Sequence, residues 1–202
     1  IHRDCFGTKP AQRPINEVTS AASESEETEQ AMDEFDARDT VKNQARIISL
    51  AEAAKIIPIV RALNFSTGVA VLRRLVAMAA KTLGEDFDIE IVETHHNQKE
   101  DAPSGTAKAL LASADPDGAY AVVNGREGRP GKRGREIGMH AVRGGTVAGE
   151  HSVFFYGPME EIELRHRADS REIFARGAVR AAQFAAKAKP GLYTIDDVLF
   201  GG

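Results

Sequence analysis

The chain has 202 residues and a net charge of −4 with a pI near 5.9, so its overall charge does not favour nucleic-acid binding. This length is sufficient for one large domain or two small ones with a substantial core, and folding requires neither a metal nor a disulfide bond. The single cysteine, Cys5, has no internal partner, and no apolar run is long enough for a membrane span or a secretory signal, so we expect a cytoplasmic protein without membrane attachment.

Residues 1–45 differ in composition from the rest of the chain. The stretch TSAASESEETEQAMDEFDARD is rich in Glu, Asp, Ser and Thr and has few large apolar residues. Two interpretations stay open, a linker or surface segment and a solvated helix from about Ser23 to Ala37. We favour the first, because Met32 and Phe35 would form only a thin apolar stripe on such a helix.

Regular patterns begin at residue 47. The run IISLAEAAKI has helical spacing and is followed by Pro58 and the strand candidate IVRAL. After the loop NFSTG, the stretch VAVLRRLVAMAAKTL repeats apolar residues every three or four positions and stops at Gly84, which predicts a helix. FDIEIVE then alternates as a half-buried strand does, with Asp86, Asp88 and Glu90 expected to face solvent.

The second half of the chain predicts a sheet between two helices. A helix runs through Leu111, and the segments IGMHAVR, HSVFFYG and EIELRHR predict strands joined by short turns, in an open mixed or antiparallel sheet. A last helix is expected from about Arg171 to Lys187, before Pro190. The residues expected to be buried on it are Ile173, Phe174, Ala178, Ala181 and Phe184.

Other polar residues are assigned structural roles. The loop NGREGRPGKRGRE contains no aromatic residue, and we favour a solvated loop over a nucleic-acid-binding arm. His140, His151 and His166 lie on strand candidates, where we expect satisfied sheet or interface residues.

The stretch ETHHNQKEDAPSGTAKALL places histidines and a lysine between a strand end and a helix start. Ser104 or Asp101 can cap the helix, and the free N–H groups of its first turn favour an anion such as a carboxylate. Lys99 would add a positive charge, and His95 and His96 would project to opposite sides of the strand end. The pattern predicts proton transfer to a small carboxylate-bearing molecule, while the alternative is an ordinary capped helix with solvated neighbours. No third ligand follows at a suitable spacing, so a metal site is disfavoured.

Several segments together resemble the dihydrodipicolinate reductase family. HHNQKEDAPSGTA is similar to the family pattern HHRHKxDAPSGTA, and ALNFSTGV to APNFSxGV. RGGTVAGEHSVFF, HRADSREIFARGAVRAA and the chain end PGLYTIDDVLF also resemble family segments in collinear order. The resemblance covers residues 46–202 and departs at Asn97 and Gln98, where the family usually has Arg and His.

The resemblance implies a function and a set of site residues. The family reduces 4-hydroxy-tetrahydrodipicolinate to tetrahydrodipicolinate in lysine and diaminopimelate biosynthesis, with hydride from NADH or NADPH. By position, His95 and Lys99 correspond to catalytic proton-transfer residues. The residues that correspond to substrate contacts are His96, Ser104, Gly105 and Thr106, with Arg171 as a further site residue. Those that correspond to the nicotinamide loop are Ala62, Leu63, Asn64 and Phe65.

The front of the chain departs from the family pattern, because residues 1–45 contain no glycine fingerprint of the form GxxGxMG. Three explanations stay open: a diverged cofactor domain, an unreliable N-terminal sequence, and a dicarboxylate-binding or assembly protein that has lost cofactor binding. The expected fold is α/β, with a reduced Rossmann-like nucleotide domain (1–65 and 171–202) and an α+β substrate domain (66–170) with an open mixed sheet. The resemblance also implies a homotetramer.

Overall fold

The computed structural model describes residues 49–201. The chain divides into two compact units, Ile1–Glu52 and Ala53–Gly202. The described residues of the first unit, 49–52, are helical. The predicted linker or surface segment at residues 1–45, and the alternative helix from Ser23 to Ala37, lie outside the described residues.

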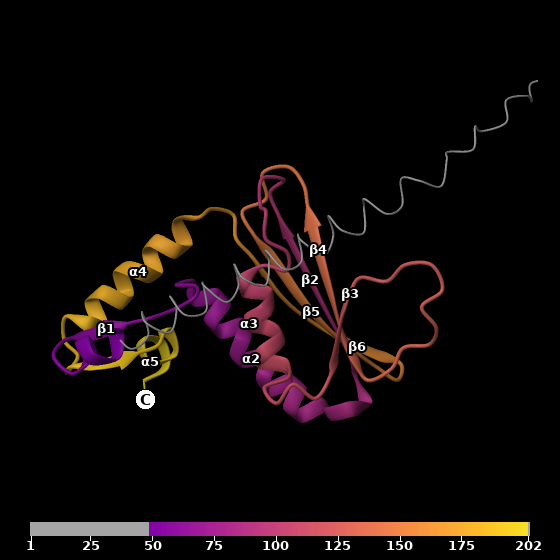
Figure 1. Ribbon diagram of the computed structural model, residues 1–202, viewed down its shortest axis with the longest axis horizontal. Helices are drawn as coiled ribbons and strands as arrows, with labels where there is room; N and C mark the ends of the chain where they lie inside the picture. The colour runs from indigo at the N-terminus through magenta and orange to yellow at the C-terminus, as the bar shows by residue number, and fades with distance from the viewer. Residues whose placement is uncertain (1–48, 202) are drawn as a thin grey trace, which may run out of the picture. The chain divides into compact units, whose positions relative to one another are not determined.

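The second unit contains the expected alternation of helices and strands (Figure 1). In chain order its elements are β1 (Pro58–Val60), α2 (Thr67–Leu83), the 3-10 turn η2 (Gly84–Asp86), β2 (Asp88–His95), α3 (Gly105–Ala114), β3 (Ala121–Asn124), β4 (Glu136–Arg143), β5 (Glu150–Gly157), β6 (Glu160–Arg167), α4 (Glu172–Ala185), β7 (Gly191–Tyr193) and α5 (Ile195–Phe200). The predicted stop of α2 is confirmed, because Gly84 adopts a φ of 62° and its N–H donates to the carbonyl of Ala80. No helix within 49–201 is long and apolar enough to cross a membrane.

The larger sheet is mixed, as predicted, with the strand order β3-β4-β2-β5-β6. β2 runs parallel to β4 and antiparallel to β5, so it lies in the centre of the sheet. Helices α2 and α3 pack together on one face. The fully buried side chains between helices and sheet include Val76, Ile91, Leu110, Ile137 and Phe155. Alternation along β2 therefore directs Ile89 and Ile91 into this core.

A smaller sheet contains only β1 and β7 among the described strands, in parallel pairing. Helix α4 packs against β1, and α5 packs against α4. A parallel pair joined through other elements is typical of α/β architecture. The fold class, α/β with a mixed sheet, is as predicted, and the assignment of 1–65 and 171–202 to a nucleotide domain stays a prediction.

One expectation about packing on α4 is wrong. Ala178 on α4 is exposed, and the neighbouring Gly177 is buried in its place. A Cβ at position 177 would come within 1.7 Å of the carbonyl oxygen of Phe65, so this close approach requires glycine. The pattern also missed β3, because its four residues are mostly exposed and its existence depends on pairing with β4.

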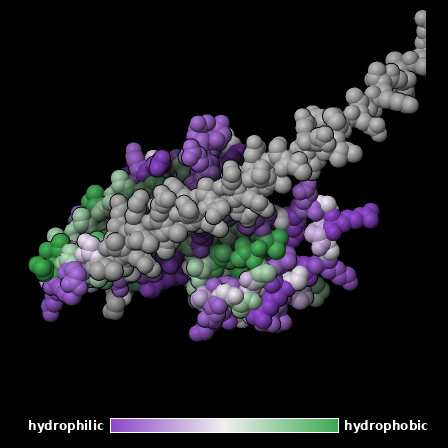
Figure 2. Space-filling view, viewed as in Figure 1, coloured by the Kyte–Doolittle hydropathy of each residue, from purple (hydrophilic) through white to green (hydrophobic). Residues whose placement is uncertain are grey.

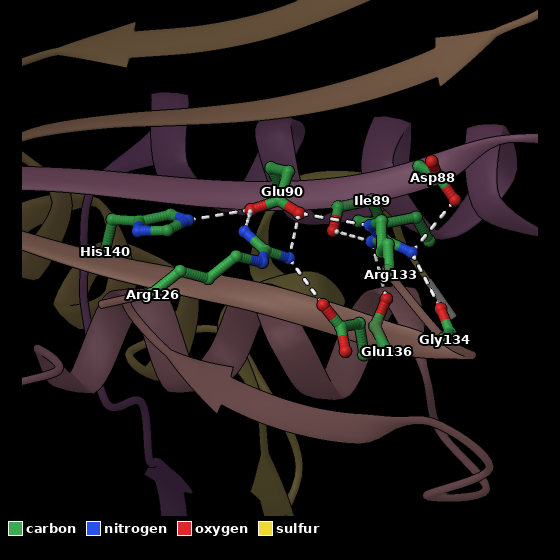
Figure 3. Close-up of polar contacts among 8 residues, drawn as sticks. All are labelled: Asp88, Ile89, Glu90, Arg126, Arg133, Gly134, Glu136 and His140. Atoms are coloured by element: carbon green, nitrogen blue, oxygen red, sulfur yellow. Dashed lines mark hydrogen bonds and ion pairs between the residues drawn. The ribbon is translucent and has the colours of Figure 1, made fainter. Parts of the chain in front are cut away.

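The expectation of a solvent-facing Glu90 is also wrong (Figure 3). Its side chain is 15% exposed and lies between Arg126, Arg133 and His140. Arg126 donates to both carboxylate oxygens at 2.7 and 3.1 Å, and His140 Nε2 lies 2.7 Å from Oε2. Burial alone would raise the pKa of Glu90, but the hydrogen bonds from Arg126, His140 and Arg133 outweigh it and lower the pKa to about 2. Two arginines of the predicted solvated loop thus fold back onto the sheet.

Candidate active site

A cavity of about 380 Å³ lies at the carboxyl end of β2, beside the start of α3. It brings together nearly all the predicted site residues: Leu63, Asn64, Phe65, His95, His96, Lys99, Ser104, Gly105, Thr106 and Arg171. Ala148 and Phe174 complete the lining and were not predicted. Ala62 lines an adjacent cavity of similar size, which shares Leu63, Asn64, Gly105 and Thr106 with the first.

Helix α3 begins at the cavity with a capped first turn. Ser104 is the N-cap residue, and its Oγ accepts a hydrogen bond from the N–H of Ala107 at 3.1 Å. The N–H groups of Gly105 and Thr106 make no hydrogen bond within the described part of the chain. Because both residues line the cavity, these two donors and the positive end of the helix dipole favour binding of an anion there.

Ser104 is itself held by the protein. It is 2% exposed, and its Oγ lies 3.1 Å from Nε2 of His151 on β5. Burial, followed by the neighbouring His95, lowers the pKa of His151 to about 4. His151 is therefore neutral near pH 7, and its Nε2 shares a hydrogen bond with the Ser104 hydroxyl whose direction depends on the ring tautomer. In this geometry the Ser104 side chain shapes the helix start, while the N–H groups that follow it stay available.

His95 is the last residue of β2, and its orientation is set by Glu93. The Nδ1 of His95 lies 2.6 Å from Oε2 of Glu93, a carboxylate with no exposed surface. Arg143 on β4 donates to both oxygens of Glu93 at 2.8 Å. The ring of His95 also meets the ring of His151 edge to face, with centroids 5.1 Å apart.

Sequence reasoning missed Glu93, Arg143 and His151 as parts of the site. One signal was available, because Glu93 follows Ile89 and Ile91 at the spacing of the buried face of β2. A carboxylate at such a position requires a charged partner. The partner itself, Arg143, lies 50 residues away and is brought near only by strand pairing.

Lys99 enters the cavity from the turn between β2 and α3. Its side chain is 19% exposed, and its ammonium group contacts the carboxylate of Asp101 at 2.5 Å. The hydrogen bond from Lys99 lowers the pKa of Asp101. The ammonium is thus close to the helix start but retains a solvent-exposed partner.

The predicted nicotinamide loop is hydrogen-bonded to helix α3. Asn64 Nδ2 donates to Oγ1 of Thr106 at 3.0 Å, and its Oδ1 accepts from the N–H of Ser66 at 2.7 Å. Leu63 beside it is 86% exposed. The adjacent cavity is lined mainly by apolar groups, together with Arg61 and Arg73. The described residues contain no group of three or more His, Cys, Asp or Glu side chains that could hold a metal ion.

Comparison with known proteins identifies relatives over most of the described chain. The family described as "Dihydrodipicolinate reductase, C-terminus" matches residues 68–199. Proteins named 4-hydroxy-tetrahydrodipicolinate reductase are 56% identical in Methanosarcina acetivorans, over 67% of this chain and 51% of that protein, and 50% identical in Methanocorpusculum labreanum, over 74% and 59%. The Brachyspira hyodysenteriae relative is 45% identical over 78% of this chain and 68% of its own.

A solved structure extends the comparison to the fold. It is a dipicolinate-bound dihydrodipicolinate reductase from Paenisporosarcina sp. TG-14, with a TM-score of 0.54 and 25% sequence identity. The match covers 70% of this chain and 55% of that chain. The chain therefore spans roughly half the length of that protein and of the first two relatives.

Proposed function

We propose, from the premise that this chain belongs to the dihydrodipicolinate reductase family, that its site reduces 4-hydroxy-tetrahydrodipicolinate to tetrahydrodipicolinate with NADH or NADPH. This step belongs to lysine and diaminopimelate biosynthesis, which supports a cytoplasmic location. The observation that carries the proposal is the cavity itself. It combines free N–H groups at the start of α3 with the imidazoles and the ammonium expected for proton transfer.

In this proposal a carboxylate of the substrate binds at the start of α3. The N–H groups of Gly105 and Thr106 donate to it, and Lys99 and His96 add positive or polar contacts at the cavity wall. Arg171 also lines the cavity and offers a second charge for a dicarboxylate. Two carboxylates on one small ring would thus be oriented by backbone and side-chain donors together.

Reduction also consumes a proton, which the site supplies through His95 or Lys99. His95 Nδ1 is engaged by Glu93, so its Nε2 is the nitrogen available for exchange. The ammonium group of Lys99 lies at the wall of the same cavity as the start of α3, where the substrate is proposed to bind. A group that donates a proton near developing charge typically contributes about 10²-fold to 10⁴-fold to a rate.

The described residues suit the nicotinamide end of a reduced dinucleotide, which would supply hydride when bound. Ala62, Leu63 and Asn64 line the apolar cavity next to the substrate cavity, and the exposed Leu63 offers a surface for a planar ring. Arg73 Nε is buried without a hydrogen-bond partner among the described residues, so it is available to donate to a polar group of a bound cofactor. The choice between NADH and NADPH is part of the experiment below.

Assembly into a homotetramer is also proposed, through the open face of the larger sheet. Val142 and Tyr156 lie on this face and are 47% and 40% exposed. Figure 2 shows one hydrophobic patch where Figure 1 places α3 and the larger sheet, with hydrophilic residues around it. An open sheet with apolar residues gains stability when a second sheet covers it. Light scattering coupled to size-exclusion chromatography tests the assembly, and a monomer at micromolar concentration would exclude it.

The experiment that tests the function is a titration followed by a turnover assay. Calorimetry with pyridine-2,6-dicarboxylate should show binding, and NADH or NADPH should bind and be oxidised when substrate is added. Lys99→Ala and His95→Ala should each lower kcat by about 10² or more while preserving the circular dichroism spectrum.

The matched control is Lys108→Ala, on the exposed side of α3. It should keep wild-type turnover. Binding of the dicarboxylate without binding of either cofactor would instead support the alternative hypothesis, in which the protein binds a dicarboxylate or serves in assembly and has lost cofactor binding. Normal turnover in both Lys99→Ala and His95→Ala would contradict the assigned roles.

A further inference from the structure

The buried carboxylate of Glu93 is hydrogen-bonded to two residues that line the cavity, His95 and Ser104. The side chain has no exposed surface, yet it accepts four hydrogen bonds from three residues. Oε2 accepts from His95 Nδ1 at 2.6 Å, and Oε1 accepts from the N–H of Ser104 at 3.0 Å. One carboxylate thus contacts both the imidazole and the N-cap residue of the anion-binding helix.

Arg143 makes this buried charge tolerable. Its two terminal nitrogens each donate to one oxygen of Glu93 at 2.8 Å, a bidentate pair. One of them also donates to the carbonyl of Asp101 at 2.7 Å, in the turn that leads into α3. Burial alone would raise the pKa of Glu93, but the hydrogen bonds from Arg143, His95 and Ser104 outweigh it and lower the pKa. Glu93 is therefore ionised at neutral pH.

We propose that Glu93, held by Arg143, is the positioning residue of this site, and that it fixes the Nδ1–H tautomer of His95 and the start of α3 at once. This inference rests on the proposed function for its consequence in turnover. The tautomer that it assigns to His95 rests on the geometry alone.

The tautomer follows from the chemistry of the contact. A carboxylate accepts hydrogen bonds and does not donate them when ionised, so Nδ1 of His95 must carry the proton. In the neutral ring this leaves Nε2 unprotonated and able to exchange a proton with a ligand. Gly149 gives this nitrogen room, because a Cβ at position 149 would lie 3.2 Å from Nε2.

Glutamine at position 93 would reverse this arrangement. The amide oxygen is expected at the position of Oε1, where Arg143 and the N–H of Ser104 both donate. The amide NH₂ then takes the position of Oε2, where it can no longer accept from Arg143 Nη1. It faces His95 and donates to Nδ1, so the proton of the ring moves to Nε2. The helix start keeps its acceptor, and ligand binding should change less than proton transfer.

The first test measures the tautomer in the full 202-residue chain. Long-range ¹H–¹⁵N correlation spectra at pH 8, with His95→Gln used for assignment, should show a protonated Nδ1 in the wild type and a protonated Nε2 in Glu93→Gln. The matched control is Glu90→Gln, the same substitution on the same strand, at a carboxylate that also contacts arginines and a histidine but on the opposite face. It should keep the wild-type His95 signals.

A wild-type His95 protonated on Nε2 would overturn the proposal, and this measurement needs no variant to fold. A Glu93→Gln spectrum identical to that of the wild type would overturn it equally. Should Glu93→Gln fail to fold, Glu93→Asp retains the charge and should retain the Nδ1–H tautomer.

The second test separates positioning from stability. Glu93→Gln should lower kcat by a factor on the order of 10² to 10⁴, with the Kd for pyridine-2,6-dicarboxylate changed by roughly fivefold or less. Glu93→Asp should recover part of the lost kcat. Equal loss of kcat in Glu93→Gln and Glu90→Gln would overturn the proposal, because it would indicate a general structural effect.

The two hypotheses fail in different ways. A wild-type chain that turns over no substrate would contradict the proposed function, while the His95 tautomer would still decide whether Glu93 positions the imidazole. Normal turnover in Glu93→Gln with a reversed tautomer would keep the function and overturn the inference.

Discussion

Gly138 on β4 lies directly opposite Glu90 on β2, and a Cβ at position 138 would come within 1.8 Å of Glu90 Oε2. The absence of a side chain at 138 is what allows the carboxylate to lie flat on the sheet between Arg126 and His140. In Figure 3 the three side chains converge over β4 in this way. The position of the Glu90 carboxylate on the open face of the sheet thus depends on the glycine at 138.

Gly138→Ala should therefore destabilise the protein. The Glu90 carboxylate would have to move away from its partners, and we expect the free energy of unfolding to fall by about 1–3 kcal/mol, as in other overpacked sites. Urea unfolding followed by circular dichroism measures the change. Gly134→Ala is the control, because nothing lies within 4 Å of a Cβ there. Equal stability of the two variants would contradict this interpretation.

Stability should fall as the pH decreases from about 4.5 to about 2, partly because of Glu90. The pKa of Glu90 is lowered from 4.5 to about 2 in the folded protein, so the unfolded chain binds the proton first. Its contribution is fully present above 4.5 and is lost as the pH falls through the folded pKa, and it amounts to roughly 3 kcal/mol. Urea unfolding between pH 6 and pH 2 should show a smaller decrease for Glu90→Gln than for the wild type. Parallel curves would show that Glu90 does not titrate in this way.

His151 should produce a separate loss of stability between pH 6.5 and about pH 4. Its pKa is lowered from 6.5 to about 4, chiefly by burial and then by His95, so the unfolded chain again binds the proton first. The stabilisation is complete above pH 6.5 and decreases as the pH falls toward 4. Glutamine in His151→Gln does not titrate and offers both a donor and an acceptor to the Ser104 hydroxyl, so this variant should flatten the curve in this range. Glu90→Gln should keep the wild-type slope there, and a slope retained in His151→Gln would exclude His151 as its source.

Asn64→Asp should weaken dicarboxylate binding. An aspartate keeps the acceptor for the N–H of Ser66, can accept from the Thr106 hydroxyl but no longer donate to it, and places a negative charge at the wall of the cavity. We expect the Kd for pyridine-2,6-dicarboxylate to rise roughly tenfold or more through repulsion between like charges. Calorimetry measures it, with Asn124→Asp on the exposed strand β3 as the control. An unchanged Kd in Asn64→Asp would place the bound anion elsewhere.

Local sequence patterns predicted most of the elements, because the signals lie within a few residues of one another. The glycine stop of α2 and the Ser104 cap of α3 both involve hydrogen bonds within one turn of a helix. The alternation in β2 likewise predicted a strand with Ile89 and Ile91 in the core. The grouping of His95, Lys99 and the start of α3 was predictable for the same reason, since these residues are separated by a short turn.

The tertiary structure alone decided which distant residues complete the site. Arg143 reaches Glu93 because β4 pairs with β2 in a parallel register, and His151 reaches Ser104 from the antiparallel strand β5. Register is set by the whole buried face of the sheet, and a shift of one residue would turn these side chains to the other face. The sequence by itself therefore determined the chemical groups that line the cavity and the helix start that faces an anion. Only strand pairing decided that Arg143 is buried against Glu93 and His151 against Ser104, because these partners come from neighbouring strands.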